Sequence, residues 1–138
     1  MKYTLDASVL VKLVVEEEYS QNAVKIISDP RAILYAPEII YHEVGSVLYK
    51  MTRRGITDKK YAIKAYENLI KLPIEISSNG WGALPDILEM SLRLGLHFYD
   101  CLYIYNAEKT GSTLVSSDRR LLDVAKKECS SKHLESIS

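Results

Sequence analysis

The sequence has few of the features that mark secreted or membrane proteins. Of its 138 residues only Cys101 and Cys129 are cysteines, which is too few for a framework of disulfide bonds. The first residues lack the basic and then apolar run of a signal peptide. No stretch approaches the roughly 18 to 20 apolar residues that span a bilayer. We therefore expect a cytoplasmic protein without membrane contact.

A net charge is also lacking. The 18 basic and 18 acidic residues cancel, so no global field attracts nucleic acid or a membrane surface. A polyanion could bind only through a local patch of basic side chains. What the chain does have is 47% hydrophobic residues over the length of one ordinary globular domain. Residues 1–138 are therefore predicted to form a single domain.

Short apolar segments alternate with longer segments of helical periodicity. Length and flanking breakers predict strands at 2–6, 32–36, 73–77, 112–116 and 133–137. Apolar residues three and four apart predict helices at 8–15, 19–28, 38–53, 58–71, 81–95, 97–110 and 118–128. Pro37 is a start signal, Gly111 a stop signal, and the longest break falls at 77–80. Such alternation predicts an α/β three-layer sandwich, with a small, mainly parallel sheet of about five strands flanked by helices.

Two acidic residues stand at the ends of predicted strands. Asp6 closes the first strand, and Asp118 comes two residues after the strand at 112–116. Ligands of parallel α/β sheets bind beyond the carboxyl ends of the strands, so both residues are candidates for a site. An Asp ahead of a helix also caps it, for about 1 kcal/mol. For each residue taken alone, capping explains the sequence equally well.

Two further carboxylates fall inside the apolar stripes of predicted helices. Glu43 lies three residues after Ile40, and Asp100 lies four residues after Leu96. Buried acidic side chains are rare unless they are paired or bind a cation, because an isolated buried carboxylate is costly. A structural salt-bridge network is one alternative, although the basic residues fall mostly at helix flanks. Four convergent carboxylates are typical of a site for Mg²⁺ or Mn²⁺, ions that bind substrate phosphates and activate water.

The order of these acids along the chain resembles that of the PIN domain. The resemblance covers essentially the whole chain. The length of the chain is also similar to that of the VapC-type toxins of toxin–antitoxin pairs. The segments that carry the likeness are LDASVL (Asp6, Ser8), PEIIYHEV (Glu43) and YDCLYIYNAEKTGSTLVSSD (Asp100, Asp118). Two positions depart from the family pattern: Ser116 replaces the usual Thr but keeps a hydroxyl, and Cys101 replaces a commoner Ala.

The resemblance implies a metal-dependent endoribonuclease that hydrolyses RNA phosphodiesters with metal-activated water. Its catalytic acids, which also hold Mg²⁺ or Mn²⁺, are then Asp6, Glu43, Asp100 and Asp118, with Ser8 and Ser116 in support. The resemblance also implies a cognate antitoxin and a homodimer as protein partners.

Basic residues are expected at the rim of such a pocket, because acids alone would repel RNA. The candidates for this RNA-binding role are Lys12, Arg53, Arg54, Arg119 and Arg120.

Two other classes of function stay open, a metal-dependent phosphatase and a non-catalytic PIN-like binding module. Asp6 and Ser8 resemble the start of an aspartyl-phosphatase motif, but that chemistry needs a second Asp as general acid. The segment HEVGS at 42–46 lacks the second His of a zinc protease. His97 and Cys101 imitate a thiol–imidazole pair, but Cys101 stands among apolar residues and is predicted to be a core residue.

Overall fold

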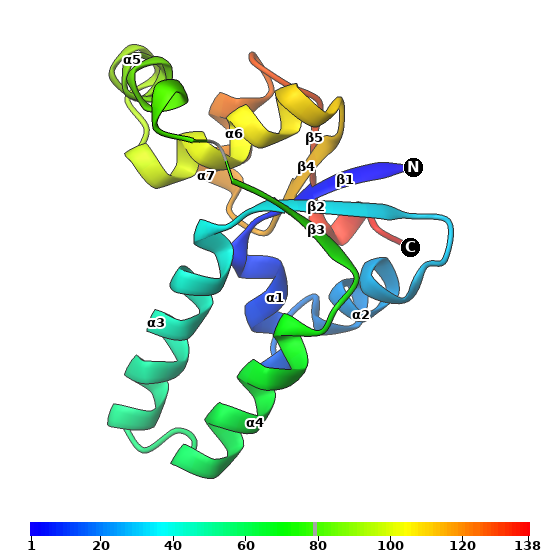
Figure 1. The fold of residues 1–138 in the computed structure, drawn as a ribbon. Coiled ribbons are helices and arrows are strands. Elements are labelled where there is room, and N and C mark those ends of the chain that lie inside the picture. Colours follow the sequence, from blue (N-terminus) through cyan, green and yellow to red (C-terminus); the bar gives the residue numbers. More distant parts are fainter. Residues whose placement is uncertain (79) are drawn as a thin grey trace.

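The computed structural model describes residues 1–78 and 80–138 and has three layers (Figure 1). The middle layer is a sheet of five strands: β1 (Lys2–Leu5), β2 (Ile33–Pro37), β3 (Ile74–Ser77), β4 (Thr113–Ser116) and β5 (Ser131–His133). The strand order is β3-β2-β1-β4-β5, and all neighbouring pairs are parallel. The predicted α/β three-layer sandwich is confirmed, and its sheet is entirely parallel.

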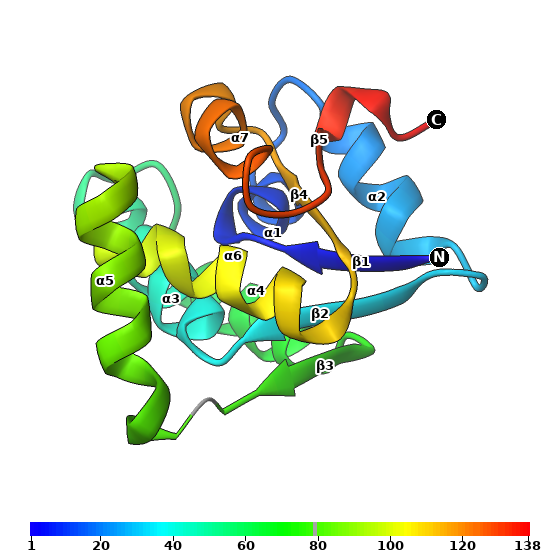
Figure 2. The same ribbon diagram turned by 90° about the horizontal axis from the view of Figure 1, so that it is seen from above.

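Helices cover both faces of the sheet (Figures 1 and 2). One face carries α1 (Ala7–Val14), α2 (Ser20–Ser28), α3 (Ile39–Arg53) and α4 (Lys59–Ile70). The other carries α5 (Leu84–Leu94), α6 (Phe98–Thr110) and α7 (Arg119–Ala125). The chain moves outward from β1 to β3, crosses back to β4 and continues to β5. Because crossovers are right-handed, this reversal of direction places the two groups of helices on opposite faces.

Apolar side chains from both helical layers meet the central strands. Leu5 of β1 and Leu114 of β4 are fully buried, as are Leu10 and Val44 on one side and Ile104 on the other. Burying one such side chain contributes about 1.5–3 kcal/mol. Packing on both faces fixes the central strands, and with them the residues that follow their carboxyl ends.

The strand predicted at 133–137 is wrong in its position. Strand β5 ends at His133, and a short 3₁₀ helix, Leu134–Ser136, follows it. The imidazole Nδ1 of His133 accepts a hydrogen bond from the backbone N–H two residues later, at 2.9 Å, which turns the chain. Leu134 and Ile137 are both buried, and their spacing of three suits this turn better than a strand.

The other predicted boundaries differ from the structure by smaller amounts. Pro37 ends β2, and α3 begins at Ile39, one residue after the helix start predicted at 38. The helix expected at 81–95 begins as a 3₁₀ turn, Trp81–Ala83, and the one expected at 118–128 is shorter, since α7 ends at Ala125. Gly111 ends α6 in the left-handed conformation (φ 64°), as its stop signal predicts. Asn79, in the break predicted at 77–80, lies outside the described residues.

Candidate active site

The candidate site lies where the strand order reverses, between β1 and β4. Chain segments leave these two strands in opposite directions, which opens a crevice at their carboxyl ends. Asp6 directly follows β1, and Asp118 follows β4 by two residues. Both acids that were predicted from strand ends therefore stand at this crevice.

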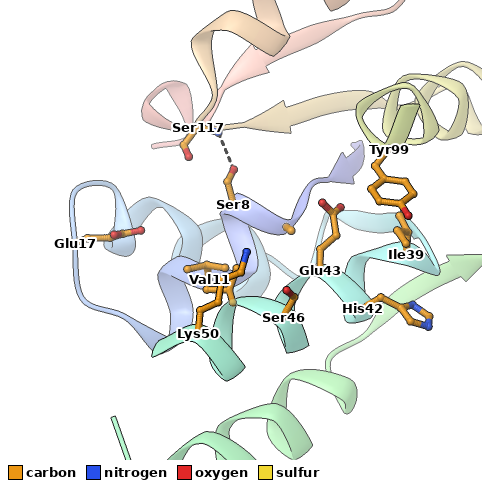
Figure 3. A pocket seen from close by; sticks show the side chains of 12 residues that line it. Ser8, Val11, Glu17, Ile39, His42, Glu43, Ser46, Lys50, Tyr99 and Ser117 are labelled. Atoms are coloured by element: carbon orange, nitrogen blue, oxygen red, sulfur yellow. Dashed lines mark hydrogen bonds between the residues drawn. The ribbon is translucent and has the colours of Figure 1, made fainter. Parts of the chain in front are cut away.

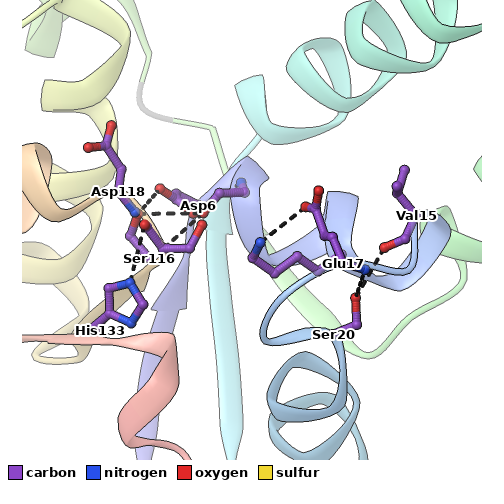
Figure 4. A network of polar contacts seen from close by, with 10 residues as sticks. Asp6, Val15, Glu17, Ser20, Ser116, Asp118 and His133 are labelled. Atoms are coloured by element: carbon purple, nitrogen blue, oxygen red, sulfur yellow. Dashed lines mark hydrogen bonds and ion pairs between the residues drawn. The ribbon is translucent and has the colours of Figure 1, made fainter.

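Asp6 is held by donors from two elements (Figure 4). Its carboxylate accepts hydrogen bonds from the backbone N–H of Ser8 (3.1 Å), the Ser8 hydroxyl (2.5 Å) and the Ser116 hydroxyl (2.5 Å). The first of these bonds makes Asp6 the N-cap of α1, so the predicted capping role is confirmed. The side chain has almost no contact with solvent, because Asp6 is only 6% exposed.

Capping alone does not account for a carboxylate at this position. Burial raises the pKa of Asp6 from 3.8 to about 6; the serine hydrogen bonds oppose this shift, and the charge of Asp118 adds to it. Since one pKa unit corresponds to about 1.4 kcal/mol, the charged form costs the fold about 3 kcal/mol at neutral pH. A cap contributes only about 1 kcal/mol, and Asn or Ser would supply it without the charge.

Asp118 is exposed and caps α7. Its carboxylate accepts hydrogen bonds from the backbone N–H groups of Arg120 (3.0 Å) and Leu121 (3.2 Å), so capping is confirmed here too. Its own backbone N–H donates to the Ser116 hydroxyl at 2.9 Å. Ser116 therefore contacts both acids, and the supporting role predicted for its hydroxyl has a geometric basis.

Glu43 and Asp100 approach from the two helical layers. Both are half-buried, in agreement with their positions in the apolar stripes of α3 and α6. Glu43 accepts a hydrogen bond from the Tyr103 hydroxyl at 2.5 Å, and burial together with this bond raises the pKa of Tyr103 strongly. Burial raises the pKa of Asp100, and the nearby charges of Asp118 and Glu43 raise it further. Charge interactions thus connect the four predicted acids in sequence: Asp6 with Asp118, Asp118 with Asp100, and Asp100 with Glu43.

The four acids stand outside the ion pairs that the described residues form. Within residues 1–78 and 80–138, none of the ion pairs involves Asp6, Glu43, Asp100 or Asp118. The salt-bridge network considered from the sequence is therefore not what holds the four carboxylates in place.

The donor set suits a hard divalent ion in its chemistry. All four side chains offer carboxylate oxygens, the ligands that Mg²⁺ and Mn²⁺ prefer. Among the described residues, however, no three His, Cys, Asp or Glu side chains stand close enough to form a ready ligand group. Three of the four carboxylates are directed at serine, tyrosine or backbone donors instead. An ionised carboxylate has about four acceptor sites, so these hydrogen bonds leave other sites on the same side chains for an ion.

A pocket of about 600 Å³ opens beside the acids, between α1 and α3 (Figure 3). In the figure Glu43 lies between Tyr99 at one end and Lys50 at the other. Lys50 follows Glu43 by two turns on the same face of α3, about 10 Å along the helix. Tyr99, next to Asp100 in sequence, is 46% exposed. The sequence prediction missed Lys50 and Tyr99, although the spacing of seven from Glu43 could have identified Lys50.

Three of the predicted basic residues lie on helices that follow the site strands, Lys12 on α1 and Arg119 and Arg120 on α7. Lys12 forms an ion pair of 3.0 Å with Glu17, and the Lys12 side chain is only 10% exposed. Glu17 lines the pocket. Arg119 forms an ion pair with Glu135 (3.0 Å). The charge of Arg120 is close enough to lower the pKa of Asp100, against the larger effects of burial and of the neighbouring acids.

The other two predicted basic residues stand elsewhere. Arg53 and Arg54 lie at the end of α3, ten and eleven residues after Glu43 and about 15 Å along the helix axis. The structure therefore does not bring them to the rim of the acid cluster.

Cys101 is a core residue, as predicted. It is fully buried, and burial together with the charge of Asp100 raises the pKa of its thiol. His97 caps α6 instead of pairing with it, since its Nδ1 accepts a hydrogen bond from the backbone N–H of Tyr99 at 3.2 Å. A thiol–imidazole mechanism has no support in this arrangement.

Comparison with known proteins identifies relatives over most of the chain. The family model of the PIN domain matches residues 3–127. Ribonuclease VapC3 of Pyrobaculum aerophilum is 31% identical over 124 residues, which cover 89% of this chain and 94% of that protein. Exonuclease VapC9 of the same organism is 29% identical over 123 residues, which cover 88% of this chain and 84% of that protein.

Solved structures share the fold. The crystal structure of PAE2754 from Pyrobaculum aerophilum has a TM-score of 0.76 and 27% identity, and the match covers 98% of this chain and 85% of that one. VapBC2 from Rickettsia felis, bound to a DNA fragment from its promoter, has a TM-score of 0.68 and 14% identity, covering 96% and 98%. No helix in the described part of the chain is long and apolar enough to cross a membrane. Sequence and fold agree that the chain belongs to the PIN-domain family, with VapC nucleases among its relatives.

Proposed function

We propose that the protein is a divalent-metal-dependent endoribonuclease and the toxin of a VapBC-type toxin–antitoxin pair. The observation that carries this proposal is the gathering of four carboxylates at the switch point of the sheet, without basic partners among the described residues. The VapC ribonuclease relative, which is 31% identical to this chain over 124 residues, supports the same assignment.

Each acid has a stated role in this proposal. Asp6, Glu43 and Asp100 would bind the principal ion, and Asp118 would complete the site or hold a second one. A bound Mg²⁺ or Mn²⁺ lowers the pKa of water and stabilises the charge that develops at the phosphate. Asp6 gains most, because a neighbouring cation offsets the burial that raises its pKa to about 6. Ser8 and Ser116 orient its carboxylate through their hydroxyls.

The pocket supports a polynucleotide substrate over a small phosphomonoester. It extends from Glu43 along α3 to Lys50, far enough for a strand to lie on one side of the scissile phosphate. Lys50 would bind a phosphate of that strand, and the exposed ring of Tyr99 offers a surface for base stacking. Lys12, Arg119 and Arg120 would add positive charge near the acids.

The experiment that tests this function uses two RNA substrates. We expect the protein to open an internally labelled circular RNA in Mg²⁺ or Mn²⁺, and to leave it intact in EDTA. A circle has no ends, so its cleavage demonstrates an endonuclease. Asp6→Asn, purified in the same way, controls for a contaminating nuclease and should leave the circle intact.

Other outcomes separate the remaining functions. Trimming of a linear RNA with the circle intact would identify an exonuclease, the activity in the name of the VapC9 relative. Turnover of a phosphomonoester with both RNAs intact would identify a phosphatase. Absence of any metal-dependent turnover would favour a binding module.

A cognate antitoxin and a second copy of the chain are the proposed protein partners, and the cytoplasm is the proposed location. The resemblance to VapC-type toxins supports the antitoxin. Co-expression with the neighbouring reading frame should yield a stable complex, and light scattering of the protein alone should give the mass of a dimer. The mass of a monomer would contradict the proposed homodimer. Failure to bind the product of the neighbouring reading frame would contradict the proposed antitoxin.

A further inference from the structure

Tyr103 joins two of the elements that carry acids. It stands one helical turn after Asp100 on α6, and its hydroxyl donates a hydrogen bond to Oε1 of Glu43 on α3 at 2.5 Å. An ionised carboxylate can only accept, so the phenol is the donor. The ring is buried, with 2% exposure, and so cannot turn away into solvent. The bond therefore fixes Glu43 relative to the helix that carries Asp100.

Glu43 depends on this bond more than Asp6 or Asp118 depends on any one of its own. Asp6 accepts from two serine hydroxyls and a backbone N–H, and Asp118 accepts from two backbone N–H groups. Glu43 lies inside α3, where the backbone N–H groups are used within the helix. In the described part of the chain, the Tyr103 hydroxyl is the one side-chain donor that Glu43 contacts. A long side chain with three rotatable bonds thus takes its orientation from a single neighbour.

We infer that Tyr103 is a positioning residue whose hydroxyl holds the Glu43 carboxylate at the acid cluster, ready to bind a divalent ion. This inference rests on the proposed function and adds a residue that itself touches neither the ion nor RNA. Loss of a group that orients a metal ligand typically costs about 10- to 100-fold in metal affinity or activity. A tyrosine that served only to fill the core would be replaced by Phe without such a loss.

The test removes one oxygen and measures metal binding separately from cleavage. Tyr103→Phe keeps the ring, so we expect it to fold with wild-type circular dichroism. After metal removal with EDTA and dialysis, thermal melts over a Mn²⁺ titration give the concentration for half-maximal stabilisation. We expect this midpoint to rise about 10-fold or more in Tyr103→Phe. Cleavage at low Mn²⁺ should fall by a similar factor and recover partly as Mn²⁺ is raised.

Tyr66→Phe is the matched control. The Tyr66 hydroxyl also donates a hydrogen bond of 2.5 Å, but to the backbone carbonyl of Tyr41, and this contact joins α4 to α3 instead of holding an acid. The same atom is lost in both variants. We expect Tyr66→Phe to keep the wild-type Mn²⁺ midpoint, whatever its effect on melting temperature.

A second variant approaches the same bond from the other side. Glu43→Asp keeps the negative charge but shortens the side chain by one methylene, which moves it away from the Tyr103 hydroxyl. It should raise the Mn²⁺ midpoint, and Tyr103→Phe should add nothing further in that background. Effects that multiply would show that Tyr103 acts independently of Glu43. If Tyr103→Phe alone does not fold, a wild-type midpoint in Glu43→Asp would still overturn the inference.

The outcomes distinguish this inference from the proposed function. A folded Tyr103→Phe with the wild-type Mn²⁺ midpoint would overturn the inference, while RNA cleavage by the wild type would leave the nuclease proposal intact. A wild-type protein that neither gains stability from Mn²⁺ nor cuts RNA would overturn both.

Discussion

The Ser116 hydroxyl donates a hydrogen bond to Asp6 at 2.5 Å and accepts one from the backbone N–H of Asp118 at 2.9 Å. A hydroxyl has one donor and two acceptor sites, so both bonds can form at once. Together they join Asp6, which follows β1, to the end of β4, 110 positions later in the chain. Ser116 thereby fixes the distance between the first and the last of the four acids.

Replacing Ser116 tests whether this connection matters for both stability and activity. Ser116→Ala leaves a buried carboxylate oxygen and a backbone N–H short of a partner, which should cost about 1–3 kcal/mol of unfolding free energy. Cleavage in Mn²⁺ should fall about 10-fold or more, because Asp6 loses a donor that orients it. Ser116→Thr keeps the hydroxyl and suits a strand, so its activity should stay within a few-fold of wild type. Urea unfolding and single-turnover cleavage measure the two effects, and equal values for Ala and Thr would contradict this role.

Asp6→Asn separates the capping role of Asp6 from its charge. Asn caps a helix about as well as Asp, so the variant should fold. Without metal it should be more stable than wild type at neutral pH, by up to about 3 kcal/mol, because no buried charge remains. Single-turnover RNA cleavage in Mg²⁺ or Mn²⁺ should fall by orders of magnitude, since an amide is a poor ligand for a hard ion. Equal cleavage rates for variant and wild type would remove Asp6 from the active site.

The raised pKa of Asp6 predicts how the stability of the metal-free protein depends on pH. With a pKa of about 6 in the folded state and 3.8 as the ordinary value, the folded state binds more protons between these limits. The contribution of Asp6 to the free energy of unfolding therefore decreases as pH rises from about 4 to about 6, by at most about 1.4 kcal/mol per pH unit. It is constant above about pH 7. Urea unfolding in EDTA over this range, for wild type and Asp6→Asn, isolates the effect as a difference. A difference that does not vary with pH would show that Asp6 keeps its ordinary pKa.

The four acids could be predicted because each breaks a local pattern. Glu43 and Asp100 interrupt apolar stripes of period 3.6, and Asp6 and Asp118 follow strands whose carboxyl ends meet at one edge in any parallel sheet. These signals need only a few neighbouring residues, and the family resemblance agrees with them. The same local reasoning located the first four strands and misplaced the fifth.

Contacts between distant segments could not be predicted in this way. Tyr103 has the pattern of an ordinary core residue, and nothing near it in sequence indicates a partner 60 positions earlier. Lys50 and Tyr99 line one pocket only because α3 packs beside α1 while α6 begins at the same sheet edge. Arg53 and Arg54 were expected at the rim because they are basic, but the length of α3 carries them away from it.

The position of Lys50 in the pocket predicts that this residue contributes to RNA binding. Binding of a labelled single-stranded RNA is measured by fluorescence anisotropy at several salt concentrations, in an Asp6→Asn background that prevents cleavage. If Lys50 contacts a phosphate, Lys50→Ala should weaken binding of all sequences similarly and reduce the slope of log affinity against log salt by about 0.7. Lys71→Ala is the matched control, since Lys71 is the C-cap of α4 and precedes β3, at the amino ends of the strands, whereas the acids lie at the carboxyl ends. It should change neither affinity nor slope.

The double replacement of Arg53 and Arg54 by Ala should also have little effect on RNA binding, because these residues lie about 15 Å along α3 from Glu43. An unchanged slope in Lys50→Ala, together with a reduced slope in the arginine variant, would place the RNA path at the far end of α3 and not in the pocket.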